Sequence, residues 1–153
     1  FKMIKEGKFP IIGSGLNRRS MVYVDNLVEG IILASKTKIA SGKTYWIADK
    51  YSYTMNEIIQ TIQSLLIYDF RIKVNTKALK LPSLTSDIAR AIDWSLQKCG
   101  LYNQEIHVLS EMNLTIACSI DKAKTELNYS PKVELKEGMK QSIQYVLKNY
   151  GDI

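Results

Sequence analysis

Residues 9–34 contain an order of elements that strongly restricts the fold of this chain. An apolar segment, Phe9–Ile12, is followed by a Gly-Ser-Gly turn, two arginines, a second apolar segment at Met21–Val24 and a predicted helix that ends near Ser35. Short strands on either side of a glycine-rich turn, leading into a helix, are typical of α/β proteins. The arginines place fixed positive charge beside the turn, which favours a ligand that carries phosphate groups.

The rest of the chain continues this alternation of strands and helices. Strands are predicted at Thr44–Ile47 and Phe70–Val74, and a strand or extended run at Leu114–Ile120. These strands are too few and too short for a complete doubly wound sheet, so we predict an α/β fold with a partial Rossmann-like sheet edge and a mostly helical subdomain. The later helices are predicted from a cap to a stop signal, at Thr54–Leu66, Ser86 or Asp87 to Cys99, Asp121–Leu127 and Leu135–Tyr150.

One apolar face of each predicted helix identifies the expected core. Asp25 or Asn26 is expected to cap the first helix, and Asn128 to Pro131 to break the short helix that starts at Asp121. The core side chains predicted for the helices are Leu27, Val28, Ile31, Ile32, Ile58, Ile59, Ile62, Leu65, Leu66, Ile88, Ala91, Ile92, Leu96, Ala123, Leu127, Leu135, Met139, Ile143, Val146, Leu147 and Tyr150.

Composition excludes several classes of protein. The 153 residues fit a single domain with a real core, and the net charge of +6 is spread along the chain rather than gathered in a basic run with aromatic residues. Nucleic acid is therefore not an expected partner. No apolar run is long enough to span a bilayer and no segment has the order of a signal peptide, so we expect a cytoplasmic protein without a membrane partner. Cys99 and Cys118 are expected to be reduced, buried thiols.

The chain lacks a complete catalytic apparatus. The Gly13–Gly15 turn has no P-loop lysine, no dinucleotide-binding glycine motif occurs, and no tyrosine is followed by a lysine four residues later. His107, the single histidine, has no partner at metal-ligand spacing and is predicted to be a structural residue. We therefore predict neither a metal site nor a catalytic residue in this chain.

Four segments, in this order, resemble the C-terminal half of the extended short-chain dehydrogenases/reductases, the NAD-dependent epimerase/dehydratase group. The matching segments are Phe9–Gly15, Arg19–Leu27, Gly42–Ala48, and Asp121–Pro131 with Leu135–Gly138. The resemblance covers nearly the whole chain. It implies that residues 1–153 form a single substrate-binding region, whereas the NAD(P)-binding half, with its Tyr-x-x-x-Lys pair, lies before Phe1.

The resemblance also implies roles for individual residues. Arg19 falls where many sugar-nucleotide enzymes have an arginine that contacts the diphosphate, and Arg18 adds a second cation beside it. Pro10 and Ile12 fall on the strand that packs along the nucleotide base, and Asn26 on a position that is usually Asp. NAD or NADP would be the cofactor of the intact protein; this chain alone is expected to bind none and to be inactive.

Three functions remain open. The first is a nucleotide-sugar epimerase, dehydratase or reductase. The second is a 3β-hydroxysteroid-dehydrogenase-like oxidoreductase with a non-nucleotide substrate, because His107–Asn113 lacks the second phosphate-binding arginine and residues 82–100 resemble that branch of the family. The third is a non-catalytic module that binds a ligand or a partner protein. The expected partners are a small-molecule substrate and a further copy of the chain, because strand edges near Thr44–Ile47 would be exposed.

Overall fold

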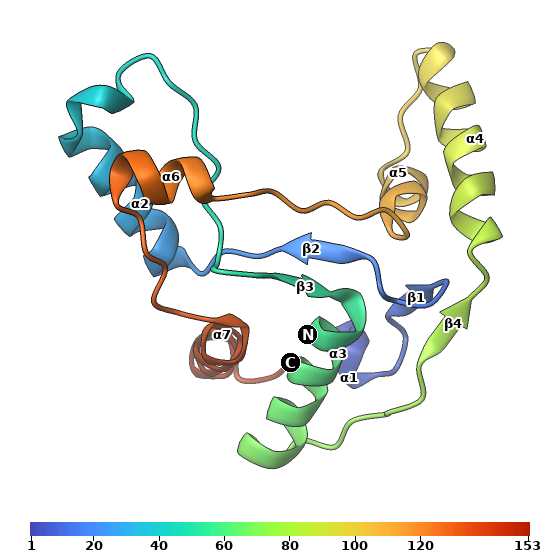
Figure 1. The fold of residues 1–153 in the computed structure, drawn as a ribbon. Coiled ribbons are helices and arrows are strands. Elements are labelled where there is room, and N and C mark those ends of the chain that lie inside the picture. The colour runs from blue at the N-terminus through green and yellow to red at the C-terminus, as the bar shows by residue number, and fades with distance from the viewer.

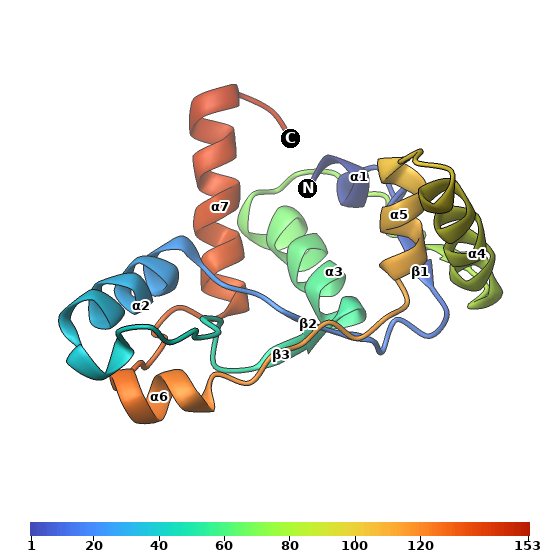
Figure 2. The ribbon, with the colours of Figure 1, turned by 90° about the horizontal axis from the view of Figure 1, so that it is seen from above.

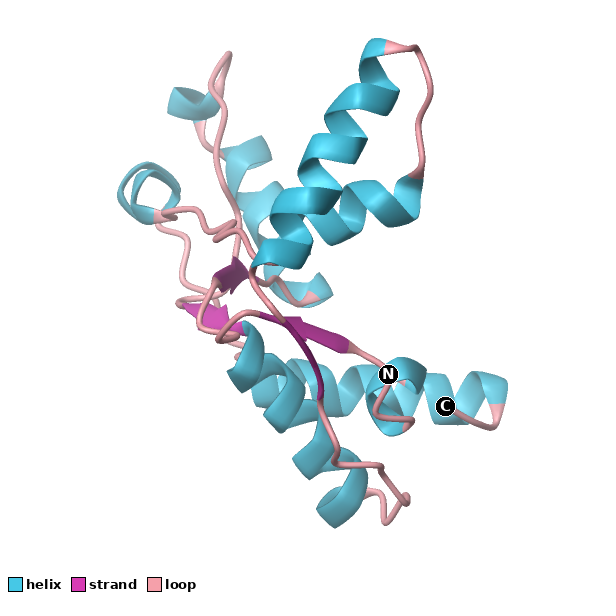
Figure 3. Ribbon diagram, turned by 90° about the vertical axis from the view of Figure 1, so that its right-hand side faces the viewer, coloured by secondary structure: helices cyan, strands magenta, loops and turns pink.

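The computed structural model describes residues 1–153, whose helices lie in three groups joined by extended chain (Figure 1). The first group surrounds the two termini, the second lies at one end of the molecule, and the third projects from the body as a hairpin (Figures 2 and 3). The first group consists of α1 (Lys2–Lys5), α3 (Met55–Ser64), the π-helical stretch η2 (Leu65–Asp69) and α7 (Leu135–Tyr150). The second consists of α2 (Val24–Lys36), the 3₁₀ turn η1 (Lys38–Ala40) and α6 (Asp121–Leu127). The third consists of α4 (Leu84–Lys98) and α5 (Gln104–Glu111).

Two small sheets connect these groups. Strand β1 (Pro10–Ile12) pairs in parallel with β4 (Leu79–Leu81), and β2 (Arg18–Ser20) pairs antiparallel with β3 (Ser52–Thr54). On its other side, β2 forms a single parallel bridge between Arg19 and Ile116. The mixed α/β class with a small partial sheet and a mostly helical remainder is therefore confirmed.

The main core lies between α1, β1, α3 and α7. Helix α3 begins with the predicted capping box, in which the Thr54 hydroxyl accepts from the Glu57 amide at 3.1 Å and the Glu57 carboxylate accepts from the Thr54 amide at 2.6 Å. The apolar side of this helix packs against α7, whose bounds are those predicted from the sequence. The buried side chains of this core are Ile4, Ile11, Ile58, Ile59, Ile62, Leu65, Leu66, Leu135, Ile143 and Ile153.

A second, smaller core joins α6 to the chain before β3. Ala123 and Leu127 are buried as predicted, together with Ala48, Ile120 and Tyr129. The Tyr129 hydroxyl donates to the Ala48 carbonyl at 3.0 Å. Asn128 adopts a left-handed conformation with φ of 57°, which ends α6 at the predicted place.

Helix α2 begins differently from the sequence prediction. The strand predicted at Met21–Val24 is wrong, because β2 lies three residues earlier, where both of its edges find main-chain partners. Val24 is already the first helical residue, and neither Asp25 nor Asn26 caps the helix. Asn26 is instead buried and holds other segments, as described below.

The predicted core faces of α2 and α4 are also wrong. On α2 the inward positions are Asn26 and Gly30, whereas the apolar side chains Leu27, Val28, Ile31 and Ile32 are between 37% and 59% exposed. On α4, which begins at Leu84 before the predicted caps Ser86 and Asp87, polar and small side chains face inward. The remaining exposed side chains that we expected to be buried are Ile88, Ala91, Ile92, Tyr150 and Cys99; Cys118 is half-buried and both thiols are free.

Two predicted strands are extended chain without a strand partner. Phe70–Val74 alternates between half-buried and exposed side chains, but the strand that pairs with β1 is β4, a few residues later. Across Thr44–Ile47 no main-chain amide donates a hydrogen bond within the chain. Leu114–Ile120 is extended, with the one bridge at Ile116. None of the helices combines the length and apolar character needed to cross a bilayer.

Candidate substrate site

Three extended segments meet along β2 and enclose a groove of about 510 Å³. Residues 20–22, 46–48 and 115–118 line it, and most of their side chains are apolar. Main-chain bonds hold two of these segments together, from the Ser20 amide to the Ile116 carbonyl at 3.1 Å and from the Ile116 amide to the Arg18 carbonyl at 2.9 Å. The third segment is fixed where the Asp49 amide donates to the Met21 carbonyl at 2.7 Å. The groove thus has walls of defined position and an apolar lining.

The two arginines of the sequence motif lie on β2, directly before Ser20, which lines this groove. Arg18 is exposed, and its guanidinium donates to the hydroxyl and the carbonyl oxygen of Ser52. Arg19 is half-buried, and its Nη2 donates to the Glu111 carbonyl at 2.7 Å. The groove is lined by Ser20 and Ile116, the chain neighbour and the bridge partner of Arg19, and not by Arg19 itself. One guanidinium donor of Arg19 is thus used within the chain, and the other N–H groups of its guanidinium form no hydrogen bond within the chain.

Pro10 and Ile12 lie on a different sheet from the arginines. Both belong to β1, which pairs with β4, whereas the arginines belong to β2. Ile12 is only 2% exposed and Pro10 is half-buried, so Pro10 is the one of the two that presents surface. The structure therefore does not bring all four predicted site residues onto one wall.

The glycine-rich turn between these strands is occupied by contacts within the chain. Gly13 and Gly15 have φ of 66° and 69°, values that favour glycine. The Asn56 side chain donates to the Ser14 carbonyl at 2.9 Å, and the Asn56 main-chain nitrogen donates to the Gly15 carbonyl at 3.1 Å. The turn leads into strand β2 and not into a helix, whereas a dinucleotide-binding turn places the pyrophosphate at a helix N-terminus. The residues of this chain therefore do not fit the phosphates of NAD at this turn.

A second hollow shares Met21 and Val22 with the groove and is lined by a buried carboxylate that the sequence did not reveal. It measures about 130 Å³ and is lined in part by Met21, Val22, Asp49 and Glu134. Asp49 is 4% exposed, and its Oδ1 accepts from the Tyr23 amide at 3.2 Å and from the Asn26 side chain at 2.9 Å. Burial raises the pKa of the Asp49 carboxyl, although these two hydrogen bonds oppose the shift.

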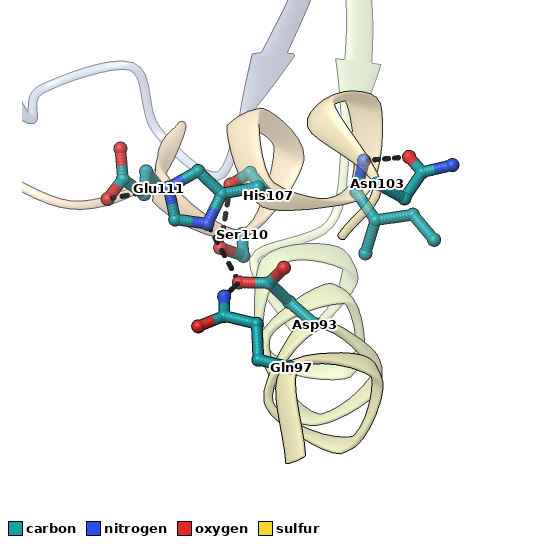
Figure 4. A network of polar contacts seen from close by, with 7 residues as sticks. Asp93, Gln97, Asn103, His107, Ser110 and Glu111 are labelled. Carbon is teal, nitrogen blue, oxygen red and sulfur yellow. Dashed lines mark hydrogen bonds and ion pairs between the residues drawn. The ribbon is translucent and has the colours of Figure 1, made fainter. Parts of the chain in front are cut away.

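The histidine of the sequence belongs to a polar network between α4 and α5 (Figure 4). His107 Nδ1 lies 2.8 Å from Oδ2 of Asp93, which also accepts from the Gln97 side chain at 2.8 Å, and His107 Nε2 lies 3.7 Å from Oε1 of Glu111. The hydrogen bond with Asp93 raises the pKa of His107 and lowers that of Asp93. No group of three or more His, Cys, Asp or Glu side chains is arranged to hold a metal ion.

Comparison of the sequence with known proteins finds relatives but no matching family model. The chain is 52% identical to the uncharacterised protein y4nL of Sinorhizobium fredii over 97% of its own length, which is 42% of that protein. It is 28% identical to 3beta-hydroxysteroid-dehydrogenase/decarboxylase isoform 1 of Arabidopsis thaliana, over 87% of this chain and 32% of the relative. A shorter match, 37% identical over 42% of the chain and 20% of the relative, joins it to N-acetyl-alpha-D-glucosaminyl-diphospho-ditrans,octacis-undecaprenol 4-epimerase of Escherichia coli O157:H7.

Solved structures show the same fold. The alignment with the protein gox2253 covers 99% of this chain and 43% of gox2253, with a TM-score of 0.67 and 20% sequence identity. UDP-glucuronic acid 4-epimerase of Bacillus cereus, solved in complex with NAD, aligns with 94% of this chain and 35% of its own, with a TM-score of 0.58 and 22% identity. The chain spans less than half the length of each of these proteins. It therefore matches the extended short-chain dehydrogenase/reductase family over part of its members' length, as the sequence motifs predicted.

Proposed function

We propose that this chain is the substrate-binding portion of an NAD(P)-dependent enzyme that acts on a nucleotide-sugar. The observation that carries the proposal is the apolar groove along β2, which lies next to Arg19 in a fold shared with a UDP-glucuronic acid 4-epimerase. An enclosed apolar groove beside a few oriented polar groups is the usual form of a small-molecule site. The groove supplies enclosure and the arginine supplies charge, which are the two features that a nucleotide-sugar needs.

In this proposal Arg19 anchors the diphosphate. Its guanidinium is oriented by the Glu111 carbonyl, and its remaining donors can form charge-assisted hydrogen bonds with phosphate oxygens. Arg18, held by Ser52, adds positive charge one residue earlier on the same strand. Pro10 supplies surface for the nucleotide base, and Ile12 holds its strand in the interior.

The redox step would take place on a part of the protein outside residues 1–153. NAD or NADP would accept or donate a hydride when bound there. The residues described here would position the substrate and exclude water from its sugar, because the groove walls are mostly apolar. The isolated chain is accordingly expected to bind substrate weakly, to bind no dinucleotide and to have no turnover.

A second candidate is a hydroxysteroid-dehydrogenase-like enzyme whose substrate carries no nucleotide. The apolar lining of the groove favours it, since Met21, Val22, Ile47, Ile116 and their neighbours offer few polar partners to a sugar. The 3beta-hydroxysteroid-dehydrogenase/decarboxylase of Arabidopsis thaliana also matches most of this chain, whereas the epimerase of Escherichia coli O157:H7 matches less than half. In this case Arg19 would serve only to fasten α5.

Calorimetric titration of the chain with UDP-glucose, a hydroxysteroid and NAD distinguishes these functions. For a nucleotide-sugar site we expect Arg19→Ala to weaken UDP-glucose binding about tenfold or more, since it removes a charge-assisted contact with phosphate. The control Arg90→Ala removes an exposed arginine of α4 and should leave binding unchanged. Steroid binding that does not depend on Arg19 would favour the second candidate. NAD binding at micromolar concentration, or binding of none of the three, would contradict the proposal.

A further inference from the structure

The guanidinium of Arg19 is fastened to the end of a helix. Its Nη2 donates at 2.7 Å to the carbonyl of Glu111, the last residue of α5. The last carbonyl groups of a helix lack helical partners and carry the negative end of its dipole, so a guanidinium there is favoured. The Asn17 side chain reinforces this junction by donating to the carbonyls of Met112 at 2.9 Å and Leu114 at 3.2 Å. The direction in which Arg19 points therefore depends on where α5 ends.

Helix α5 in turn packs closely against α4. The inward side chains of α4 are Ser86, Ala89 and Asp93, and no residue of α4 or α5 belongs to either apolar core. The two helices project together from the body (Figure 3). The side-chain hydrogen bond between them is the one that joins Asp93 and His107, at 2.8 Å (Figure 4). The two helices also pack closely along their length, so this pair is the polar part of a wider contact between them.

This pair depends on the charge of His107. Asp93 is 6% exposed, and its Oδ1 has no hydrogen-bond partner, so its buried charge is compensated through Oδ2 by His107 and Gln97. The groups that face His107 are Asp93 from α4, Glu111 from α5 at 3.7 Å, and the Tyr102 ring, with centroids 5.6 Å apart. Loss of the histidine charge would leave the buried carboxylate with neutral donors alone, the Gln97 amide and an imidazole N–H, and hydrogen bonds from neutral donors are weaker than charge-assisted ones. The contact between the helices would weaken accordingly.

We propose that Asp93 and His107 form a proton-dependent latch that sets the orientation of Arg19, so that phosphate binding at Arg19 weakens when the histidine is neutral. The inference rests on the proposed function, because it concerns the same arginine. Protonated His107 holds α5 on α4, the Glu111 carbonyl stays in place, and Arg19 is oriented for its ligand. Neutral His107 releases α5, and Arg19 then loses part of its orientation. The hydrogen bond with Asp93 raises the pKa of His107, so this change occurs at a higher pH than it would for a histidine without that partner.

The first test observes the latch without a ligand. In an isotope-labelled chain, the side-chain NMR signal of Arg19, assigned with Arg19→Lys, is followed from about pH 6 to about pH 9. We expect it to shift with the same midpoint as the His107 ring signals. His107→Gln should abolish the shift, and Asp93→Asn should move the midpoint to lower pH. The control Asp87→Asn removes an exposed carboxylate on the same helix and should leave the midpoint unchanged. An Arg19 signal that does not follow His107 in the unaltered chain would overturn the latch.

The second test measures the coupling with UDP-glucose, whose diphosphate does not change its charge across this pH range. Affinity should fall about fivefold or more as His107 loses its proton, which is an ordinary size for coupling between two sites. In His107→Gln the affinity should no longer change across this transition. A fall that persists in His107→Gln would overturn the proposal. If UDP-glucose does not bind at any pH, the proposed function fails and the NMR signal alone decides on the latch. Should Asp93→Asn fail to fold, the unaltered chain and His107→Gln still decide.

Discussion

The side chain of Asn26 donates to Oδ1 of Asp49 across 2.9 Å, and both residues are almost completely buried. The same amide nitrogen donates to the Val133 carbonyl at 2.7 Å, and the amide oxygen accepts from the main-chain nitrogens of Lys132 and Val133 at 3.0 and 3.1 Å. All four hydrogen-bonding positions of the amide are therefore used. One side chain of α2 joins the chain before β3 to the chain before α7.

Replacing Asn26 by alanine should destabilise the chain substantially. The change leaves the Lys132 and Val133 amides without a side-chain acceptor and Asp49 without one donor, in the interior of the protein. We expect the free energy of unfolding to fall by about 2–4 kcal/mol, measured by urea denaturation. The control Asn149→Ala removes an amide that donates to the Tyr145 carbonyl on the exposed side of α7, and should cost at most about 0.5 kcal/mol. Equal losses for the two variants would contradict this account of Asn26.

Asp49 should make stability depend on pH in the opposite direction to most carboxylates. Burial raises its pKa in the folded chain, so between its unfolded and its folded pKa the folded state binds more protons. Stability from this group is therefore highest at low pH and declines as pH rises through the raised pKa. Asp49→Asn should remove that decline, because the amide oxygen can still accept from Tyr23 and Asn26 and no charge is buried. Denaturation at a series of pH values measures this, with the exposed Asp25→Asn as control. An unchanged pH dependence in Asp49→Asn would contradict the prediction.

The capping box at the start of α3 should stabilise the folded chain. Thr54→Ala removes the hydroxyl that accepts from the Glu57 amide, and we expect a loss of about 1 kcal/mol in the free energy of unfolding. Thr76→Ala, in an exposed loop, removes the same atoms without a cap and should have little effect. The difference between the two variants in thermal unfolding measures the cap. A Thr54→Ala variant as stable as Thr76→Ala would show that the cap contributes nothing.

The parts of the fold that the sequence predicted correctly are those that local signals determine. The capping box starts α3, the Asn128 turn stops α6, and α7 runs between its predicted bounds. Each of these signals lies within a few residues of the element that it controls. The positions of the strands were harder to predict from the sequence, because a strand of three residues forms only where a distant segment supplies its partner. Arg18–Ser20 has such partners and Thr44–Ile47 has none.

Distant partners also explain why the buried faces predicted for α2 and α4 were wrong and why several polar residues near the site were missed. The inward positions of α2 and α4 include Asn26 and Asp93, whose burial depends on partners more than ten residues away that no periodic pattern reveals. Asp49 and the pair of Asp93 with His107 were missed for the same reason. Arg19 was found because it stands in a contiguous motif. Its contact with Glu111, on a helix that the sequence did not predict, could not be anticipated.

Gly30 should control where the extended segment at Thr44–Ile47 lies. A Cβ at this position would meet Cγ2 of Ile47 at 2.8 Å and two other atoms of the same side chain at 3.0 and 3.1 Å. Gly30→Ala should therefore push this wall of the groove away from α2 at a net cost of about 1–3 kcal/mol, despite the better helix propensity of alanine. The fluorescence of Trp46, next to Ile47, reports the displacement, while Ser95→Ala on exposed α4 tests the effect of helix propensity alone. Unchanged fluorescence and undiminished stability in Gly30→Ala would contradict this.

The same segment should drive self-association of the chain. Its main-chain amides are unpaired and Trp46 is 68% exposed, and α2 exposes the apolar side chains of Val28, Ile31 and Ile32. An unpaired extended edge beside an apolar surface tends to pair with another chain. We expect sedimentation velocity to show an oligomer whose fraction rises with protein concentration. Trp46→Lys should shift the distribution towards monomer, because a charge at an edge opposes pairing, whereas Trp94→Lys, at the other exposed tryptophan, should not. A monomer across the whole concentration range, or equal effects of the two lysines, would contradict the role of this edge.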